Sequence, residues 1–179
     1  MTRRRRDSRI VFDASPLASF AVVGRLDLLE SRYADGALWT VEVRDEIERG
    51  VPSNGELRDV LTAAWLGQPI RLDSLDVLLR IERLRFRLGG NGRSVRRHRG
   101  EAATIVAAQV HDAACAIDDL DARRLAQALD VPVVGTLGIL QACCRDGGIS
   151  WDDGWEVYQA MRAVGRRLPE LSRARFERV

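Results

Sequence analysis

The sequence lacks lysine altogether: its 28 basic residues are all arginine, set against 26 acidic residues. A phosphate-binding loop of the Walker type needs a lysine, so this class of nucleotide site is excluded. Receiver domains and haloacid-dehalogenase-type phosphatases also need a lysine, and they are excluded on the same ground. The net charge of +2 does not by itself indicate any partner.

Cysteines are few, and their spacing is not that of metal ligands. Cys115, Cys143 and Cys144 each lie in an apolar pattern, which predicts small buried side chains in a reducing compartment. The chain has no apolar run approaching the ~18 residues needed to span a membrane. The basic stretch Thr2–Arg6 is not followed by an apolar segment of the signal-peptide type. We therefore predict a cytoplasmic protein without membrane contact.

The most informative stretch is Arg9–Leu17, with the sequence RIVFDASPL. Three apolar residues predict a buried strand that ends at Asp13, and Ser15 and Pro16 suit the beginning of a helix. Asp13 is therefore expected at the carboxyl end of a strand, facing the amino end of a helix. In α/β proteins, ligands and catalytic groups gather at this place.

Strands and helices alternate along the rest of the chain. Apolar runs predict short strands at residues 37–40, 113–117 and 131–134, and a very short one at 70–72. Helical spacing predicts helices over residues 17–23, 26–33, 41–48, 56–66, 72–88, 102–111, 122–129, 137–144, 151–164 and 168–176. This alternation favours an α/β fold with a mostly parallel sheet and helices on both faces.

Four acidic residues are expected at one edge of this sheet. Asp13 and Asp119 follow apolar strands, whereas Glu46 and Glu101 lie in the first turns of helices. The carboxyl ends of parallel strands share an edge with the helix starts that follow them. Glu101 belongs to a helix that precedes its strand, so topology alone places it less securely.

Carboxylates that converge in one cleft repel one another, which raises their pKa values and lowers stability. A bound divalent cation offsets this repulsion, and oxygen-only ligands favour magnesium or manganese over zinc. Such a metal activates a water molecule and neutralises the charge that develops on a phosphodiester. No other residue type is needed for hydrolysis of this kind.

The four acidic segments resemble the motifs of the PIN-domain ribonucleases, a family that includes the VapC-type toxins of prokaryotic toxin–antitoxin pairs. The segments are Ile10–Ser15, Val43–Ile47, Gly100–Ala103 and Ile117–Asp121. Residues 134–138 and 161–168 are similar to those of an uncharacterised PIN-like subgroup of bacterial and archaeal proteins. The resemblance covers nearly the whole chain and implies a three-layer α/β/α sandwich around a short, mostly parallel sheet.

The resemblance implies that Asp13, Glu101 and Asp119 bind the metal directly. The adjacent Asp118 stays open as an alternative to Asp119. Simpler explanations exist for single residues, because an aspartate at a strand end often caps a helix and Glu101 suits its helix dipole.

By the same resemblance, Glu46 and Asp121 support these ligands or hold a second ion, and Ser15 hydrogen-bonds a metal-bound water. Glu46 stands among other acidic residues, so a solvated helix face is the competing explanation. Asp121 can equally be the N-cap of the helix that begins after it.

Arginines immediately before Glu101 are candidates for contact with RNA phosphates. Arg97 and Arg99 belong to the basic run Arg93–Arg99, which follows a glycine-rich stretch. The guanidinium fork matches phosphate oxygens, although a solvated loop explains the run as well.

We therefore expect a Mg²⁺- or Mn²⁺-dependent endoribonuclease that hydrolyses RNA phosphodiester bonds. The alternative is a catalytically silent PIN-like module that binds RNA or protein. A role as a toxin comes from the resemblance alone, and it implies an antitoxin protein and a homodimer. Residues 1–8 are expected to form a flexible basic tail, residues 9–165 the PIN-like domain, and residues 166–179 an arginine-rich C-terminal extension with a helix.

Overall fold

The computed structural model describes residues 9–89 and 97–178 of the chain. The predicted tail at residues 1–8 and most of the arginine run Arg93–Arg99 lie outside the described residues. Within the described residues, no helix is long and apolar enough to cross a membrane.

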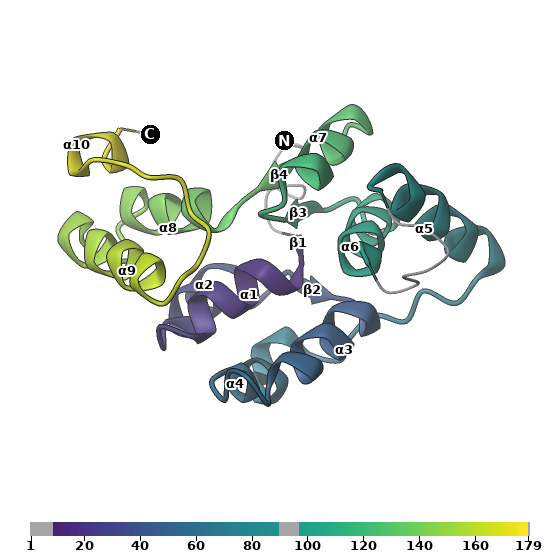
Figure 1. The fold of residues 1–179 in the computed structure, drawn as a ribbon, viewed down its shortest axis with the longest axis horizontal. Coiled ribbons are helices and arrows are strands. Elements are labelled where there is room, and N and C mark those ends of the chain that lie inside the picture. The colour runs from purple at the N-terminus through teal and green to yellow at the C-terminus, as the bar shows by residue number, and fades with distance from the viewer. Residues whose placement is uncertain (1–8, 90–96, 179) are drawn as a thin grey trace.

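The described strands form one parallel sheet at the centre of the molecule, in the order β2-β1-β3-β4 (Figure 1). They are β1 (Ile10–Phe12), β2 (Ala37–Trp39), β3 (Ala114–Ala116) and β4 (Val133–Val134). Phe12 lies opposite Trp39 on one side and Ala116 on the other. The prediction of a short parallel sheet is confirmed. The strand expected at residues 70–72 is reduced to a single bridge between Thr40 and Ile70.

Helices occupy most of the remaining chain, close to the predicted ranges. They are α1 (Ala14–Ala21), α2 (Leu26–Tyr33), α3 (Val41–Gly50), α4 (Leu57–Thr62), α5 (Leu75–Arg87), α6 (Arg99–Val110), α7 (Leu120–Ala128), α8 (Thr136–Arg145), α9 (Trp151–Ala163) and α10 (Arg173–Phe176), with a 3₁₀ turn η1 (Ala64–Leu66).

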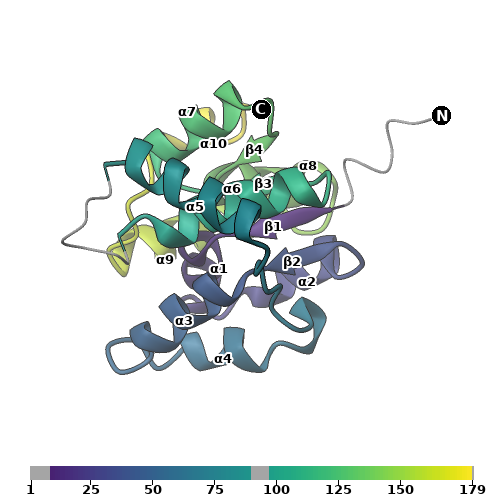
Figure 2. The same cartoon turned by 90° about the vertical axis from the view of Figure 1, so that its right-hand side faces the viewer.

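Alternate strand residues pack on opposite faces of the sheet, which creates three layers. Ile10 and Phe12 belong to one buried cluster, formed with α1–α4 and α8–α10. Val11 belongs to the other, formed with α5–α7. Figure 2 shows α5 and α6 in front of the sheet. The α/β/α sandwich is confirmed, and its strands are buried on both faces, as expected of a parallel sheet.

Two predicted helices are wrong in extent. The helix expected over residues 56–66 divides into α4 and η1, because Ala63 adopts an extended backbone with ψ of 101°. The helix expected over residues 168–176 is confined to α10. Residues before it are held away from helical geometry: the Tyr158 hydroxyl donates to the Pro169 carbonyl at 2.7 Å and accepts from the Leu171 N–H at 2.9 Å.

The residues after position 165 fold back onto the core, where Phe176 is fully buried between Trp151, Trp155 and Tyr158. The boundary that the sequence suggests at residue 165 stays a prediction. The three cysteines are buried and free, as expected.

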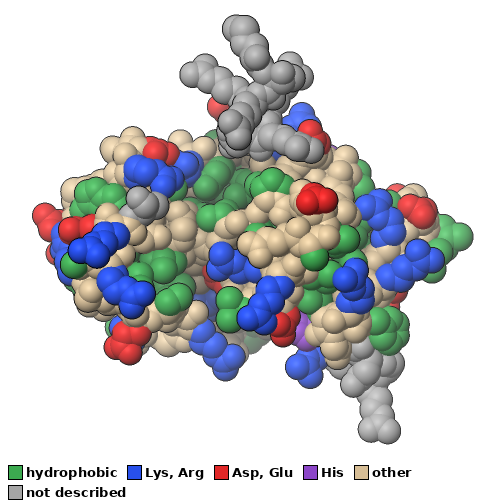
Figure 3. Space-filling view, turned by 90° about the horizontal axis from the view of Figure 1, so that it is seen from above, with side chains coloured by type: hydrophobic (Ala, Val, Ile, Leu, Met, Phe, Trp, Pro, Cys, Tyr) green, Lys and Arg blue, Asp and Glu red, His purple; other side chains and the backbone are tan. Residues whose placement is uncertain are grey.

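The face of the molecule seen from above carries several separate arginine side chains. Figure 3 shows them dispersed among hydrophobic and acidic groups on the face seen from above. On this face, the described part of the chain presents no single continuous basic patch.

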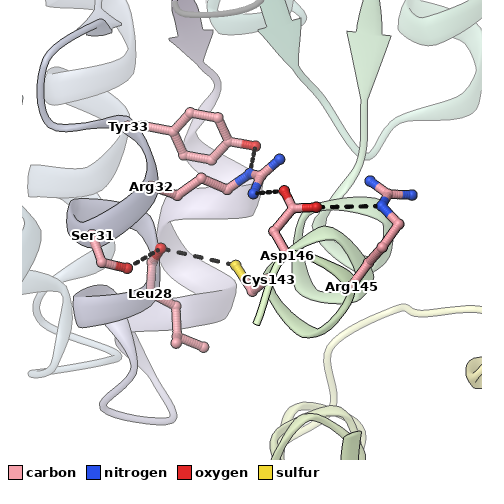
Figure 4. A network of polar contacts seen from close by, with 7 residues as sticks. All are labelled: Leu28, Ser31, Arg32, Tyr33, Cys143, Arg145 and Asp146. Carbon is pink, nitrogen blue, oxygen red and sulfur yellow. Dashed lines mark hydrogen bonds and ion pairs between the residues drawn. The ribbon is translucent and has the colours of Figure 1, made fainter. Parts of the chain in front are cut away.

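A polar network joins the end of α8 to α2 (Figure 4). Arg32 forms an ion pair with Asp146 and donates to the Tyr33 hydroxyl at 3.1 Å. Arg145 approaches the other oxygen of Asp146 at 3.6 Å. These contacts tie together two helices that cover the same face of the sheet.

Candidate functional site

The strands β1 and β3 end side by side at the point where the chain changes direction across the sheet. From β1 the chain goes to β2 on one side, and it later returns to β3 and β4 on the other. In open parallel sheets, the crevice at such a switch point is where ligands bind. The Asp13 N–H donates to the Ala116 carbonyl at 3.0 Å, which fixes the end of β1 against β3.

Asp13 is 5% exposed and begins α1 as its N-cap. Its Oδ2 accepts from the Ser15 N–H at 3.4 Å. Its Oδ1 is buried and has no hydrogen-bond partner among the described residues. A buried acceptor left without a partner costs about 1–3 kcal/mol, so capping does not account for this side chain.

Glu46 faces Asp13 across Gly100. Thr40 caps α3 by accepting from the Val43 N–H at 3.4 Å, and this sets the rotation of the helix that carries Glu46. A Cβ atom placed on Gly100 would lie 2.9 Å from Glu46 Oε2 and 3.3 Å from Asp13 Oδ1. Glycine at this position therefore leaves room for two carboxylates to approach the same point.

Glu101 lies in the first turn of α6, next to Gly100. A helix that leads into a parallel strand begins at the carboxyl edge of the sheet, which brings Glu101 to the same edge as Asp13. His98, the N-cap of α6, places its Nδ1 3.4 Å from Glu101 Oε1. The sequence did not decide whether Glu101 lies at the carboxyl edge, and the structure places it there.

The carboxylates affect one another electrostatically. Burial raises the pKa of Asp13 well above its usual value, and Glu101 and Glu46 raise it further. Glu46 keeps part of its surface in solvent, yet desolvation by the surrounding protein, together with Glu101, raises its pKa, while Arg49 opposes the shift. Both shifts reflect burial and the repulsion between neighbouring carboxylates.

The two aspartates after β3 have different surroundings. Asp118 accepts from Thr136 with both oxygens, at 2.7 Å from the N–H and 2.7 Å from Oγ1. Asp119 is the N-cap of α7 and uses Oδ1 to accept from the Ala122 N–H at 2.8 Å. Asp118 therefore links the end of β3 to the start of α8 with both of its oxygens, whereas Asp119 Oδ2 has no hydrogen bond among the described residues.

These side chains line one cavity of about 550 Å³, which we call the acidic cavity. Its lining consists of Asp13, Ser15, Ser19, Glu46, Glu101, Asp118, Asp119, Leu120, Gly165, Arg166, Arg167 and Leu168. The segments that follow β1 and β3, helices α3 and α6, and the chain after α9 thus meet there. Ser15 lies in the lining, as the predicted role requires.

Three predicted site residues lie elsewhere. The Asp121 side chain is 76% exposed, pairs with Arg124 at 3.2 Å and lines a separate hollow. Arg99 lines a neighbouring hollow that shares Glu46 with the acidic cavity. Arg97 is exposed, and its Nε lies 3.1 Å from a ring nitrogen of His98.

Two polar residues near the site were missed by sequence reasoning. Glu42 also lines the hollow next to Glu46, and its Oε2 is buried without a hydrogen-bond partner among the described residues. Arg166 enters the acidic cavity from the segment after α9. Both stand in stretches of the sequence that contain several charged residues, so local patterns do not separate them from an ordinary solvated surface.

The donor set fits a hard divalent cation. All its candidate ligands are carboxylate oxygens, and Asp13 Oδ1 is a buried acceptor that lacks a partner. Over residues 9–89 and 97–178, no three His, Cys, Asp or Glu side chains are already gathered closely enough to hold a metal. Coordination would therefore need carboxylates to rotate toward a common point.

Comparison with known proteins agrees with this arrangement. No curated protein and no solved structure matches the chain. A family model described as PIN domain matches residues 9–178 and so includes every carboxylate of the acidic cavity. PIN domains are generally nucleases that use divalent metals. The chain therefore belongs to the PIN-domain family and has its nuclease-type fold.

Proposed function

We propose that this protein is a divalent-metal-dependent endoribonuclease that hydrolyses RNA phosphodiester bonds with Mg²⁺ or Mn²⁺. The observation that carries the proposal is the buried, partnerless Oδ1 of Asp13 at the switch point of the sheet, with Glu46 and Glu101 beside it. An acid that is costly to bury is expected where a cation normally neutralises it.

Asp13, Glu101 and Asp119 would hold the ion. When bound, the cation supplies charge neutralisation at the phosphodiester and activation of a water molecule. Glu46 lies beside Asp13 at the same cavity and would be the carboxylate placed to accept a proton there. The role expected for Asp121 stays a prediction.

Cleavage of RNA tests this proposal directly. Wild type is expected to cleave a mixed RNA substrate in Mn²⁺, and Asp13→Asn is expected to be slower by about 10²-fold or more, because a principal ligand is lost. Asp59→Asn, which changes an exposed aspartate on α4, is the matched control and should cleave as wild type does. Equal cleavage by folded wild type and folded Asp13→Asn would contradict the mechanism.

A second candidate is a PIN-like module that binds RNA or protein without catalysis. It is favoured by the lack, in the described residues, of carboxylates already gathered for a metal. Calorimetric titration with Mn²⁺ separates the two candidates. The nuclease should bind Mn²⁺ in a manner that depends on Asp13, whereas the silent module should show no such binding.

The biological part of the proposal is a toxin of a toxin–antitoxin pair, acting in the cytoplasm as a homodimer. It rests on the family, since VapC-type toxins are PIN domains. Expression of wild type should arrest growth, and Asp13→Asn should not. An antitoxin would cover the acidic cavity and block cleavage, and light scattering after gel filtration measures the mass of the assembly.

A further inference from the structure

Arg166 enters the acidic cavity on a backbone that is fixed on both sides. Helix α9 ends at Ala163, and Gly165 turns the chain with a φ of 83°, a left-handed conformation that favours glycine. The Arg166 N–H donates to the Met161 carbonyl at 3.0 Å, and the Arg166 carbonyl accepts from the Leu168 N–H at 2.9 Å. The side chain therefore starts from a defined position.

The start of α1 orients the guanidinium. Arg166 Nε donates to Ser19 Oγ at 2.9 Å, and Nη2 donates to the Ser15 carbonyl at 3.0 Å and approaches Ser15 Oγ at 3.4 Å. Ser19 is itself buried, and its hydroxyl donates to the same Ser15 carbonyl at 2.9 Å. An arginine has five N–H donors, and these contacts use those of Nε and Nη2.

The other amino group, Nη1, has no hydrogen bond within the described part of the chain. It is not a buried atom, so a ligand can reach it. Since Arg166 lines the acidic cavity, Nη1 is the donor that remains for a ligand there. The geometry thus presents a pre-oriented donor beside the carboxylates.

The charge of Arg166 is also not neutralised by an ion pair within the described residues. No carboxylate of the described residues lies within ion-pair distance of it, whereas Arg162, four residues earlier, pairs with Glu170 at 3.3 Å. Burial lowers the pKa of Arg166, and the nearby Asp118 opposes this effect. A half-buried cation held by hydroxyl and carbonyl groups keeps its capacity to bind an anion.

We propose that Arg166 binds the RNA substrate by donating from Nη1 to a non-bridging oxygen of a phosphate in the acidic cavity. This inference rests on the proposed function and names a substrate-binding residue for it. An acidic cavity repels a polyanion, so a fixed guanidinium is needed to hold the phosphate close to the carboxylates and their cation. Arginine suits this task because its planar fork matches phosphate oxygens.

RNA binding provides the test. Binding of a fluorescent single-stranded RNA oligonucleotide is measured by anisotropy, with Ca²⁺ replacing Mn²⁺ and RNA integrity checked on a denaturing gel. Arg166→Gln should weaken binding about tenfold or more, since a charge-assisted hydrogen bond is lost. It should also reduce the slope of log K against log salt by about 0.7. Arg162→Gln, the control, should stay within about twofold of wild type, because its ion pair is outside the cavity.

Arg166→Lys separates charge from geometry: it keeps the charge but loses the fork, so it should bind between wild type and Arg166→Gln. Ser19→Ala leaves the charge intact and removes the acceptor of Nε, so it should cause a smaller loss. If Arg166→Gln fails to fold in thermal melts, these two variants decide the matter. Wild-type affinity in both of them would then overturn the inference.

Metal binding and cleavage distinguish this inference from the proposed function. Arg166→Gln should bind Mn²⁺ at least as tightly as wild type by calorimetry, because a nearby positive charge has been removed. Cleavage by wild type with undiminished RNA binding by Arg166→Gln would overturn the role of Arg166 and leave the nuclease intact. Loss of RNA binding in Arg166→Gln, without cleavage by wild type, would support Arg166 and contradict the nuclease.

Discussion

Replacing Asp13 by asparagine should stabilise the metal-free protein and remove its stabilisation by metal. The amide keeps the size of the side chain and an oxygen that accepts from the Ser15 N–H, so the cap of α1 survives. What disappears is a buried negative charge that Glu46 and Glu101 repel. The substitution therefore removes the electrostatic repulsion at the site and keeps the cap of α1.

The magnitude follows from the approach to Gly100. Asp13 Oδ1 and Glu46 Oε2 lie within 3.3 Å of one point, hence at most roughly 6 Å apart, where two unit charges repel by about 2–3 kcal/mol at an effective dielectric constant of about 20. Solvent around the Glu46 side chain screens part of this repulsion between the two carboxylates. We expect the free energy of unfolding to rise by about 1–3 kcal/mol, which corresponds to roughly 3–10 °C in Tm for a domain of this size.

The pH dependence has a definite sign. Because the folded-state pKa of Asp13 is raised, the folded protein binds this proton more tightly than the unfolded chain does. The contribution of protonated Asp13 to the free energy of unfolding of wild type is fully present below the unfolded-state pKa of about 3.9. It is lost as the pH rises through the folded-state pKa. Asparagine does not titrate. The advantage of Asp13→Asn is therefore largest above the folded-state pKa and vanishes in acid.

Thermal melts in EDTA at several pH values, repeated with Mn²⁺, measure both effects. Wild type should gain stability with Mn²⁺ and overtake the variant, because a ligand that binds only the folded state stabilises it. Asp13→Asn should not respond. The reasoning is refuted if the metal-free variant is less stable than wild type at pH 8, since Asp13 would then be a net stabilising group without any cation.

Three further predictions address the surroundings of the site. Gly100→Ala should weaken Mn²⁺ binding about tenfold by calorimetry, because the added Cβ would occupy the space between the Asp13 and Glu46 carboxylates. The variant should still fold, since alanine favours the helix by up to about 1 kcal/mol. Thr136→Val removes the hydroxyl that donates to Asp118 and should lower the free energy of unfolding by about 1–3 kcal/mol in denaturant titrations. Arg32→Met breaks the ion pair to Asp146 and should cost about 1 kcal/mol, with Mn²⁺ affinity unchanged.

The sequence was sufficient for the part of the site that backbone topology determines. Asp13 and Asp119 each follow an apolar run, and parallel strands that end in acidic residues bring those residues to one edge. Asp121 lies two residues beyond Asp119, already inside α7, so the end of β3 does not determine where its side chain points. A helical turn directs that side chain outward, where it meets Arg124.

Glu101 shows a limit of reading elements one at a time. Glu101 begins a helix that precedes a strand, so the local motif alone does not place it at the carboxyl edge of the sheet. The three-layer arrangement removes the difficulty, because α6 has to return from the carboxyl edge to the start of β3 before that strand can run parallel to β1. The placement follows from the whole sheet and not from the local motif.

Arg166 could not be found from local patterns, because its contacts depend on packing between distant segments. It meets Ser19 across 147 positions of sequence. That meeting requires the chain after α9 to run along α1, and the Tyr158 hydroxyl holds this segment through Pro169 and Leu171. In the sequence, Arg166 is one of many arginines near the C-terminus. What sets it apart is a long-range contact with α1 that fixes its guanidinium, at a cavity that it shares with carboxylates from the first and middle thirds of the chain.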